Sequence, residues 1–163
     1  YGRIDPARPV FPEPESLLSR SGTILGLDGN KMSKSRGNTI ELGMTADETA
    51  KLLKRAVTDS DRHITYDPVN RPEVSNLVNI AAMCLDRTPE DVAEEIGDGG
   101  GGGLKRLTTA AVNDHFAAHR ARRVELMADP GMLRDVLRAG NERANAVAEA
   151  TLAEVRQAMC MDY

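Results

Sequence analysis

Residues 45–57, TADETAKLLKRAV, mark the point at which the sequence becomes helical. Thr45 and Glu48 have the spacing of a capping box, in which each side chain bonds to the backbone N–H of the other residue. Apolar side chains then recur at helical spacing, at Ala46, Ala50, Leu53 and Val57. We therefore predict a helix that opens at Thr45 and runs to about Val57.

Similar start signals recur along the rest of the chain. Pro72 stands at the first position of a predicted helix whose apolar series ends at Leu85. Thr88 and Pro89 open a short helix that we expect to end near Gly97. Two longer helices are predicted further on, over residues 104–125 and 132–159. The predicted fold class is therefore mainly α, a small helical bundle.

A run of five glycines, Gly99–Gly103, separates the short helix from the next one. With Gly97 the run contains G-x-G-x-x-G, but a helical segment precedes it where a dinucleotide site needs a strand. Leu104 follows the last glycine, where a P-loop needs lysine. We therefore expect a helix C-cap followed by a flexible joint.

The segment before residue 45 lacks helical spacing. Prolines stand at Pro6, Pro9, Pro12 and Pro14 and predict an extended, irregular stretch. The apolar run Ile24–Leu27, bounded by Gly22 and by a turn at Asp28, predicts one short buried strand. Because a single strand is not stable alone, and because the sequence opens with Tyr1, we expect that residues have been removed upstream or that a longer gene product is represented in part.

Composition and charge narrow the possible functions. The chain of 163 residues is 40% hydrophobic and 28% charged, and no apolar run is long enough to span a membrane. Because the net charge is −4, contact with nucleic acid would depend on local patches. The densest basic residues are Lys105, Arg106, Arg120, Arg122 and Arg123, for which a solvated helix face is an equally good interpretation.

The cysteines and histidines do not predict a metal site. Cys84 and Cys160 lack C-x-x-C spacing, and two cysteines are too few for a disulfide framework, so a reduced, cytoplasmic setting is expected. His115 and His119 are four residues apart, but Phe116 stands where the H-E-x-x-H pattern needs glutamate. We interpret them as ordinary polar-face histidines.

The strongest chemical signal is the pentapeptide KMSKS within the segment LDGNKMSKSRGN, residues 27–38. It consists of Lys31, Met32, Ser33, Lys34 and Ser35. Two lysines three residues apart on a short polar loop can face one polyanion, and the flanking glycines let the backbone turn sharply beside phosphate. The alternative is a solvated basic loop, but a chance match of five specified residues is rare.

The chain resembles the C-terminal half of a bacterial tryptophanyl-tRNA synthetase, a class I aminoacyl-tRNA synthetase, and is most similar to the actinobacterial enzymes. The segments that carry the resemblance are YGRIDP (1–6), VFPEP (10–14), DGNKMSKSRGN (28–38), AVTDSD (56–61), ITYDP (64–68), RPEVSNL (71–77) and AEATLAEVR (148–156). KMSKS alone would not separate this family from the methionine or leucine enzymes, so the helical segments make the assignment.

The resemblance implies roles for the loop and for the helices. Lys31 and Lys34 would neutralise charge on the β- and γ-phosphates of ATP, which is bound with magnesium as a substrate. Met32 and Ser33 would lie along the nucleotide, with Ser35 among the nucleotide-binding residues. Residues 1–43 would end a nucleotide-binding, Rossmann-like domain, and residues 44–163 would form an α-helical anticodon-binding domain. The implied partners are tRNA(Trp) and a second copy in a homodimer, with neither membrane nor DNA.

The sequence departs from the family at one motif. Class I synthetases need H-x-G-H, and none of the three histidines here is followed by x-Gly-His. We therefore expect half an active site, inactive without an upstream half or a partner subunit. A free-standing module that binds tRNA(Trp) without aminoacylation is the alternative. A structural or regulatory subunit is a third possibility, which no residue specifically favours.

Overall fold

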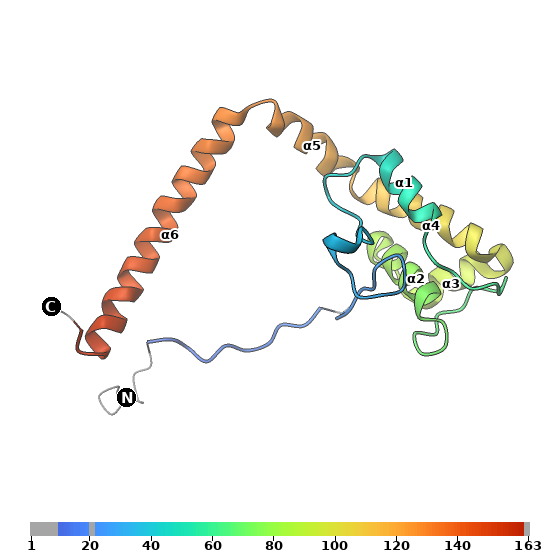
Figure 1. Ribbon diagram of the computed structural model, residues 1–163, viewed down its shortest axis with the longest axis horizontal. Coiled ribbons are helices and arrows are strands. Elements are labelled where there is room, and N and C mark those ends of the chain that lie inside the picture. Colours follow the sequence, from blue (N-terminus) through green and yellow to red (C-terminus); the bar gives the residue numbers. More distant parts are fainter. Residues whose placement is uncertain (1–9, 20–21, 162–163) are drawn as a thin grey trace. The chain divides into compact units, whose positions relative to one another are not determined.

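The computed structural model describes residues 10–19 and 22–161, which fall into two compact units. One unit is Ser19–Arg123, and the other combines the described residues up to Leu18 with the described residues from Val124 onward. The helices within the first unit are α1 (Ala46–Lys54), α2 (Pro72–Leu85), α3 (Pro89–Ile96) and α4 (Gly100–His115). Helix α2 packs against α3 and α4, and α1 packs against α4 (Figure 1). The predicted mainly α class is confirmed.

The helices begin where their capping residues predict. The Thr45 N–H donates to Glu48 Oε2 at 2.8 Å, and the Glu48 N–H donates to Thr45 Oγ1 at 3.2 Å, which completes the predicted capping box. Pro72 is the first residue of α2, and Thr88 accepts a hydrogen bond from the Asp91 N–H ahead of α3. These starts are confirmed. Helix α1, however, ends at Lys54, three residues before the predicted Val57.

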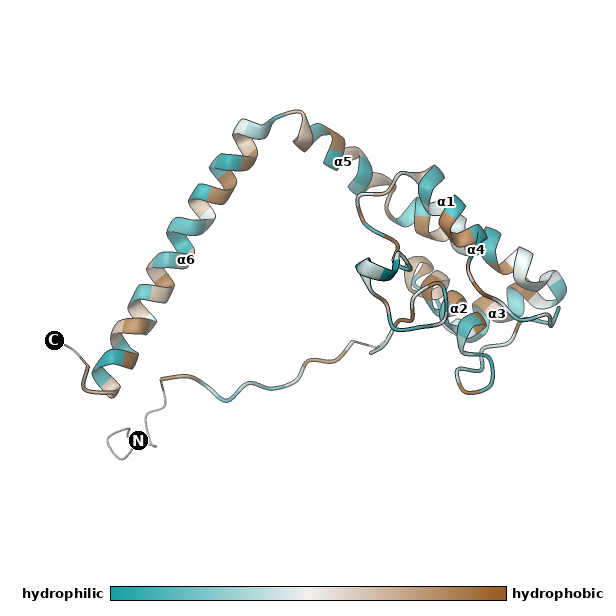
Figure 2. Cartoon of the chain, in the orientation of Figure 1, coloured by the Kyte–Doolittle hydropathy of each residue, from teal (hydrophilic) through white to brown (hydrophobic). Residues whose placement is uncertain are grey.

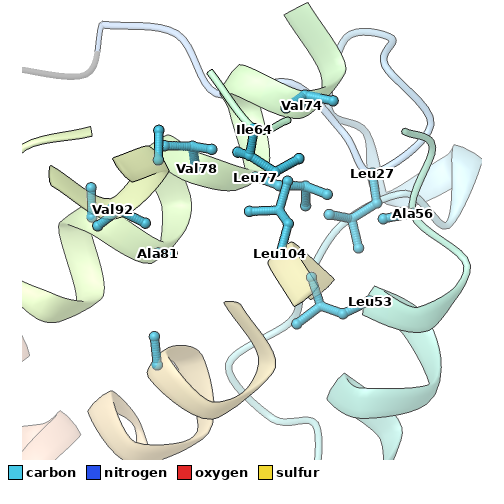
Figure 3. Close-up of a cluster of buried hydrophobic side chains, with 13 residues drawn as sticks. Leu27, Leu53, Ala56, Ile64, Val74, Leu77, Val78, Ala81, Val92 and Leu104 are labelled. Atoms are coloured by element: carbon cyan, nitrogen blue, oxygen red, sulfur yellow. The ribbon is translucent and has the colours of Figure 1, made fainter. Parts of the chain in front are cut away.

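One hydrophobic core holds these helices and the preceding loop together (Figure 3). Its buried members are Leu27, Leu53, Ala56, Ile64, Val74, Leu77, Val78, Ala81, Ala82, Val92, Ala93, Leu104 and Ala111. Leu77 from α2 and Leu104 from α4 lie at its centre, and Leu27 reaches it from the loop that precedes α1. Burying a side chain of this size contributes about 1.5–3 kcal/mol, so the loop is attached to the helices by its own apolar residue.

The predicted strand at Ile24–Leu27 is wrong. Within the described residues this segment makes one isolated antiparallel bridge, between Leu25 and Lys31. The chain reverses too early for a ladder, because the Gly26 N–H already donates to Asn30 O at 2.8 Å. The side chain of Asn76 on α2 takes the place of a neighbouring strand. Its Oδ1 accepts the Leu25 N–H at 2.8 Å, and its Nδ2 donates to Leu25 O at 3.0 Å.

The glycine run is helical, so the predicted flexible joint is also wrong. Gly97 does cap α3 as expected, but a 3₁₀ turn, η2 (Gly97–Gly99), leads directly into α4 at Gly100. Contacts distant in sequence hold this turn. The Gly100 N–H donates to Arg62 O at 2.9 Å, and Gly101 lies against the side chain of Thr58.

The predicted helix over residues 104–125 is divided in two. Helix α4 ends at His115, and α5 (Ala117–Met127) begins after Phe116. The interruption is slight, because the Phe116 N–H still donates to Val112 O and the Arg120 N–H to Phe116 O.

The second unit contains α6 (Pro130–Ala158), which begins two residues before the predicted residue 132 and has Asp129 as its N-cap. The Met132 N–H donates to Asp129 Oδ1 at 3.0 Å. Although its apolar residues keep helical spacing, no residue of α6 is buried, and hydrophobic and hydrophilic residues follow each other along it (Figure 2).

The segment before the loop has no regular structure. Residues 10–19 form neither helix nor strand, as Pro12 and Pro14 predict, whereas Pro6, Pro9 and the opening Tyr1 lie outside the described residues. Across 10–19 and 22–161, no helix combines the length and the apolar character needed to cross a membrane.

The glycine run generates a stability prediction. Gly102 is exposed in the first turn of α4, and a Cβ built there would have its nearest neighbour at 3.6 Å, on Arg106. Alanine is more favourable than glycine within a helix by about 0.5–1 kcal/mol. We expect Gly102→Ala to raise the free energy of unfolding by up to that amount, measured by urea denaturation.

Gly101→Ala is the matched control in the same turn. A Cβ at position 101 would lie 2.7 Å from Thr58 Oγ1 and 3.2 Å from Thr58 Cβ, so this change should lower stability or leave it unimproved. Equal stabilisation by both changes would contradict the packing of the run against Thr58.

Candidate functional site

The KMSKS residues form one exposed loop ahead of α1. Lys31, Lys34 and Ser35 are exposed, and Lys34 opens a 3₁₀ turn, η1 (Lys34–Arg36). Gly37 closes this turn in the left-handed region, with φ 62°, and its N–H donates to Lys34 O. A side chain at this φ would be strained, which agrees with the predicted role of the flanking glycines.

The turn that enters the loop is closed by backbone and carboxylate contacts. The Gly29 N–H donates to Gly26 O at 3.0 Å, and Gly29 has φ 79°. Asp28 Oδ1 accepts the Asn30 N–H at 3.1 Å and the Asn38 amide at 2.7 Å. The hydrogen bond from Asn38, followed by that from the Asn30 backbone, lowers the pKa of Asp28. The loop therefore has a carboxylate at its base at neutral pH.

A mostly apolar cavity of about 200 Å³ lies between this loop and helices α2 and α4. Met32 lines it together with Ile40, Met83 and Phe116, whereas neither motif lysine does. Cys84 also lines it, and burial raises the pKa of its thiol. Because little of this lining is polar, the cavity does not suit the phosphates.

A second hollow, of about 800 Å³, lies between α1 and the first turns of α4. Three cationic side chains line it, Lys54, Lys105 and Arg106. Two threonines and the glycine backbone complete the polar part of its surface, at Thr58, Thr109, Gly101 and Gly102. The sequence indicated Lys105 and Arg106 as a basic pair but could not show that Lys54 joins them, because the last residue of α1, Lys54, and the first residue of α4, Gly100, are 46 positions apart in the sequence.

Among the described residues that line this hollow, the one acidic side chain, Asp59, is neutralised locally. Arg71 Nε donates to Asp59 Oδ2 at 2.7 Å, and Arg71 Nη2 donates to Asp59 Oδ1 at 2.8 Å. These hydrogen bonds lower the pKa of Asp59 and keep it ionised and paired. The hollow therefore keeps a net positive charge, which suits a phosphate-bearing ligand.

The structure separates Arg120 from the basic pair. Its Nε donates to Met44 O at 2.9 Å, its Nη1 to Asn113 Oδ1 at 2.8 Å and its Nη2 to Thr49 Oγ1 at 3.0 Å. Arg120 therefore connects the segment before α1 to α4, and its guanidinium is engaged within the protein.

Comparison with known proteins places these features in context. Residues 2–117 match the sequence model of the family described as tRNA synthetases class I (W and Y). Curated tryptophan–tRNA ligases from Thermosynechococcus vestitus and Nostoc sp. are 39% and 36% identical over 92% and 93% of this chain. The chain spans about half the length of these relatives, 47% in each case. Tryptophan–tRNA ligase 1 of Streptomyces coelicolor is 41% identical over 69% of the chain, which supports the expected actinobacterial likeness only loosely.

Solved structures give the same result. Tryptophanyl-tRNA synthetase from Campylobacter jejuni, complexed with ADP and tryptophan, matches with a TM-score of 0.66 at 28% sequence identity. The match covers 92% of this chain and 47% of that one. A second structure of that synthetase matches with a TM-score of 0.64 at 27% identity.

The Asp59–Arg71 pair predicts a pH dependence of stability. The folded-state pKa of Asp59 is lowered, so its contribution is present above the unfolded value near 4 and is lost as the pH falls through the folded value. Because Asp59 is about two-fifths exposed, we expect the pair to contribute roughly 1 kcal/mol to the free energy of unfolding at neutral pH. Asp59→Asn should lower the free energy of unfolding by that amount at pH 7 and by progressively less below pH 4, in urea titrations.

The same change made in an Arg71→Met background is the control. Without the guanidinium, Asp59→Asn should have little further effect at pH 7. An undiminished effect in that background would show that the pair is not the source of the stabilisation.

Proposed function

Because this chain belongs to the family of class I tRNA synthetases for tryptophan and tyrosine, we propose that it supplies two parts of a tryptophan–tRNA ligase. These parts are the loop that binds the phosphates of ATP and the helices that bind tRNA(Trp). The observation that carries the proposal is the KMSKS loop, which presents two exposed lysines on a backbone closed by turns at both ends.

During adenylate formation, the loop would stabilise the negative charge that develops on the leaving phosphates. In that reaction a carboxylate oxygen of tryptophan attacks the α-phosphorus of ATP, the bond from that phosphorus to the bridging oxygen breaks, and pyrophosphate leaves. Negative charge grows on the β- and γ-phosphates as the bond breaks, and Lys31 and Lys34 would stabilise it. A positioned donor of this kind is worth about 10²–10³ in rate. The ADP in the Campylobacter jejuni synthetase supports a nucleotide as the ligand.

The other motif residues would have supporting roles. Ser33 and Ser35 have their hydroxyl oxygens 2.8 Å apart and would contact the nucleotide from the same side of the loop. Met32 lines the apolar cavity beside the loop, so its contact with the nucleotide would come from the backbone. Magnesium would enter with ATP as part of the substrate.

The hollow between α1 and α4 would bind the RNA backbone. Lys54, Lys105 and Arg106 form a local positive patch on a chain whose net charge is −4, which meets the requirement for a local RNA contact. Phosphate contacts of this kind position an RNA, and base contacts made elsewhere on the helices would specify the anticodon.

The remaining half of the active site would come from an upstream Rossmann-like half or a partner subunit, because the chain spans about half of its relatives. Under this proposal residues 1–43 complete the nucleotide-binding domain, residues 44–163 are the anticodon-binding domain, and the intact enzyme is a cytoplasmic homodimer.

The catalytic part of the proposal is tested by tryptophan-dependent ATP–pyrophosphate exchange, on the natural gene product that contains this chain. Lys31→Ala and Lys34→Ala should each lower the exchange rate about 10²–10³-fold. Lys51→Ala, which removes an exposed lysine of α1 outside the loop, should leave it unchanged. Exchange that survives both loop changes would overturn the proposed role of the motif.

The RNA-binding part is tested by the affinity of the chain for a tRNA(Trp) transcript at several salt concentrations. Lys105→Ala should weaken binding and reduce the slope of log K against log salt by about one, because one phosphate contact is lost. Lys51→Ala is again the control. Selective tRNA binding by a natural product without exchange activity would favour the free-standing module instead.

A further inference from the structure

We propose that Asn38 is a positioning residue that directs the motif lysines toward phosphate. The proposal rests on the phosphate-binding function proposed above, and it adds a residue outside the KMSKS pentapeptide to the machinery of the loop. Asn38 lies three residues after Ser35, and its side chain is hydrogen-bonded to the backbone of the loop.

The Asn38 amide bonds to the motif on both sides of Met32. Its Nδ2 donates to Lys31 O at 3.2 Å, and its Oδ1 accepts the Ser33 N–H at 2.8 Å. Nδ2 also donates to Asp28 Oδ1 at 2.7 Å, at the turn that enters the loop. One planar group therefore holds the backbone of residues 31–33 and the preceding turn in a fixed relation.

Because Asn38 is buried, losing these hydrogen bonds would be costly. Asn38 is only 4% exposed, so a polar atom of the motif that lost this partner would have little water to replace it. The Asn38 backbone contributes as well, because its carbonyl accepts the Leu27 N–H at 3.0 Å. Leu27 is a core residue, so Asn38 connects the loop to the packed interior through its backbone and to the motif through its side chain.

The chemistry of the site requires an amide. The three side-chain contacts need an acceptor on one face and two donated hydrogens on the other, and asparagine supplies both. Aspartate has the same shape but no donor when ionised, and it would set two carboxylates against each other at Asp28. An apolar residue would leave Asp28, Lys31 O and the Ser33 N–H without this partner.

Gly26 leaves room for the amide. A Cβ at position 26 would lie 2.1 Å from Asn38 Nδ2, 2.4 Å from Asn38 Cγ and 2.9 Å from Asp28 Oδ1. No side chain can occupy that position while Asn38 keeps its place. The absence of a side chain at Gly26 therefore lets the Asn38 amide keep its position.

The experiment uses the ¹⁵N-labelled chain, with inorganic tripolyphosphate as the probe for the triphosphate. Binding is followed by NMR shifts of the loop amides, and hydrogen exchange of the Ser33 N–H reports whether the loop is held. At pH 7.5 we expect Asn38→Asp to weaken tripolyphosphate binding about tenfold and to speed exchange at Ser33.

Two comparisons distinguish positioning from general damage. As the pH falls toward 5, one proton shared by the facing carboxylates restores a donor, so the ratio of variant to wild-type affinity should return toward one. Gly26→Ala displaces the same amide without adding an acid, so its loss should not recover with pH. In both variants the amides of α2 and α4 should keep their protection.

Asn70→Asp is the matched control. Asn70 Nδ2 donates to Asp67 Oδ2 at 2.7 Å, the same pair at the same distance in an exposed loop away from the motif. This change also sets an aspartate against an aspartate, but it should leave tripolyphosphate binding and Ser33 exchange unchanged.

The outcomes separate the two proposals. Unchanged Ser33 exchange and unchanged binding in Asn38→Asp would overturn the positioning role, as would a loss of protection throughout α2 and α4, which would make Asn38 a residue of the fold. A wild-type loop that does not respond to tripolyphosphate would overturn the phosphate-binding role instead, while Ser33 exchange would still show whether Asn38 holds the loop.

Discussion

The side-chain amide of Asn76 attaches the KMSKS loop to the helical core. It projects from α2 and pairs with both the N–H and the carbonyl of Leu25, in the manner of a neighbouring strand. Helix α2 is itself packed against α3 and α4, so the entrance of the loop is hydrogen-bonded to a helix of the core. The bridge from Leu25 to Lys31 and the turn between them depend on this attachment.

Beyond the attachment at Leu25, a series of contacts holds the rest of the loop. Leu27 enters the core, Asp28 and Asn38 close the base, and the backbone around Met32 is bonded to a buried amide. Lys31 and Lys34 remain exposed to solvent. This arrangement combines exposed charged groups with a hydrogen-bonded backbone, which is what phosphate recognition by preorganised donors requires.

The two basic features lie in one compact unit and differ in how they are built. The loop lysines are close in sequence and face solvent on a turn, whereas the hollow assembles Lys54 with Lys105 and Arg106 from two helices. Arg71 contributes indirectly to the positive charge of the hollow, because it neutralises Asp59, the acidic side chain among the described residues of the lining. A chain with a net charge of −4 thus presents positive charge at two defined places.

The sequence by itself determined the mainly α class, the family, the starts of α1, α2 and α3 and the glycine that closes the loop. The helix starts and the closing glycine depend on residues within about four positions of each other, such as the pair Thr45 and Glu48, so local spacing is sufficient to predict them. The tertiary structure decided the rest. The side chain of Asn76 pairs with the backbone of Leu25, 51 positions earlier, where a neighbouring strand would otherwise be needed. Thr58 and Arg62 contact the glycine run, which is helical. Gly26 and Asn38 share one space that neither reveals alone, because distant side chains and buried hydrogen bonds override local preference where the chain packs against itself.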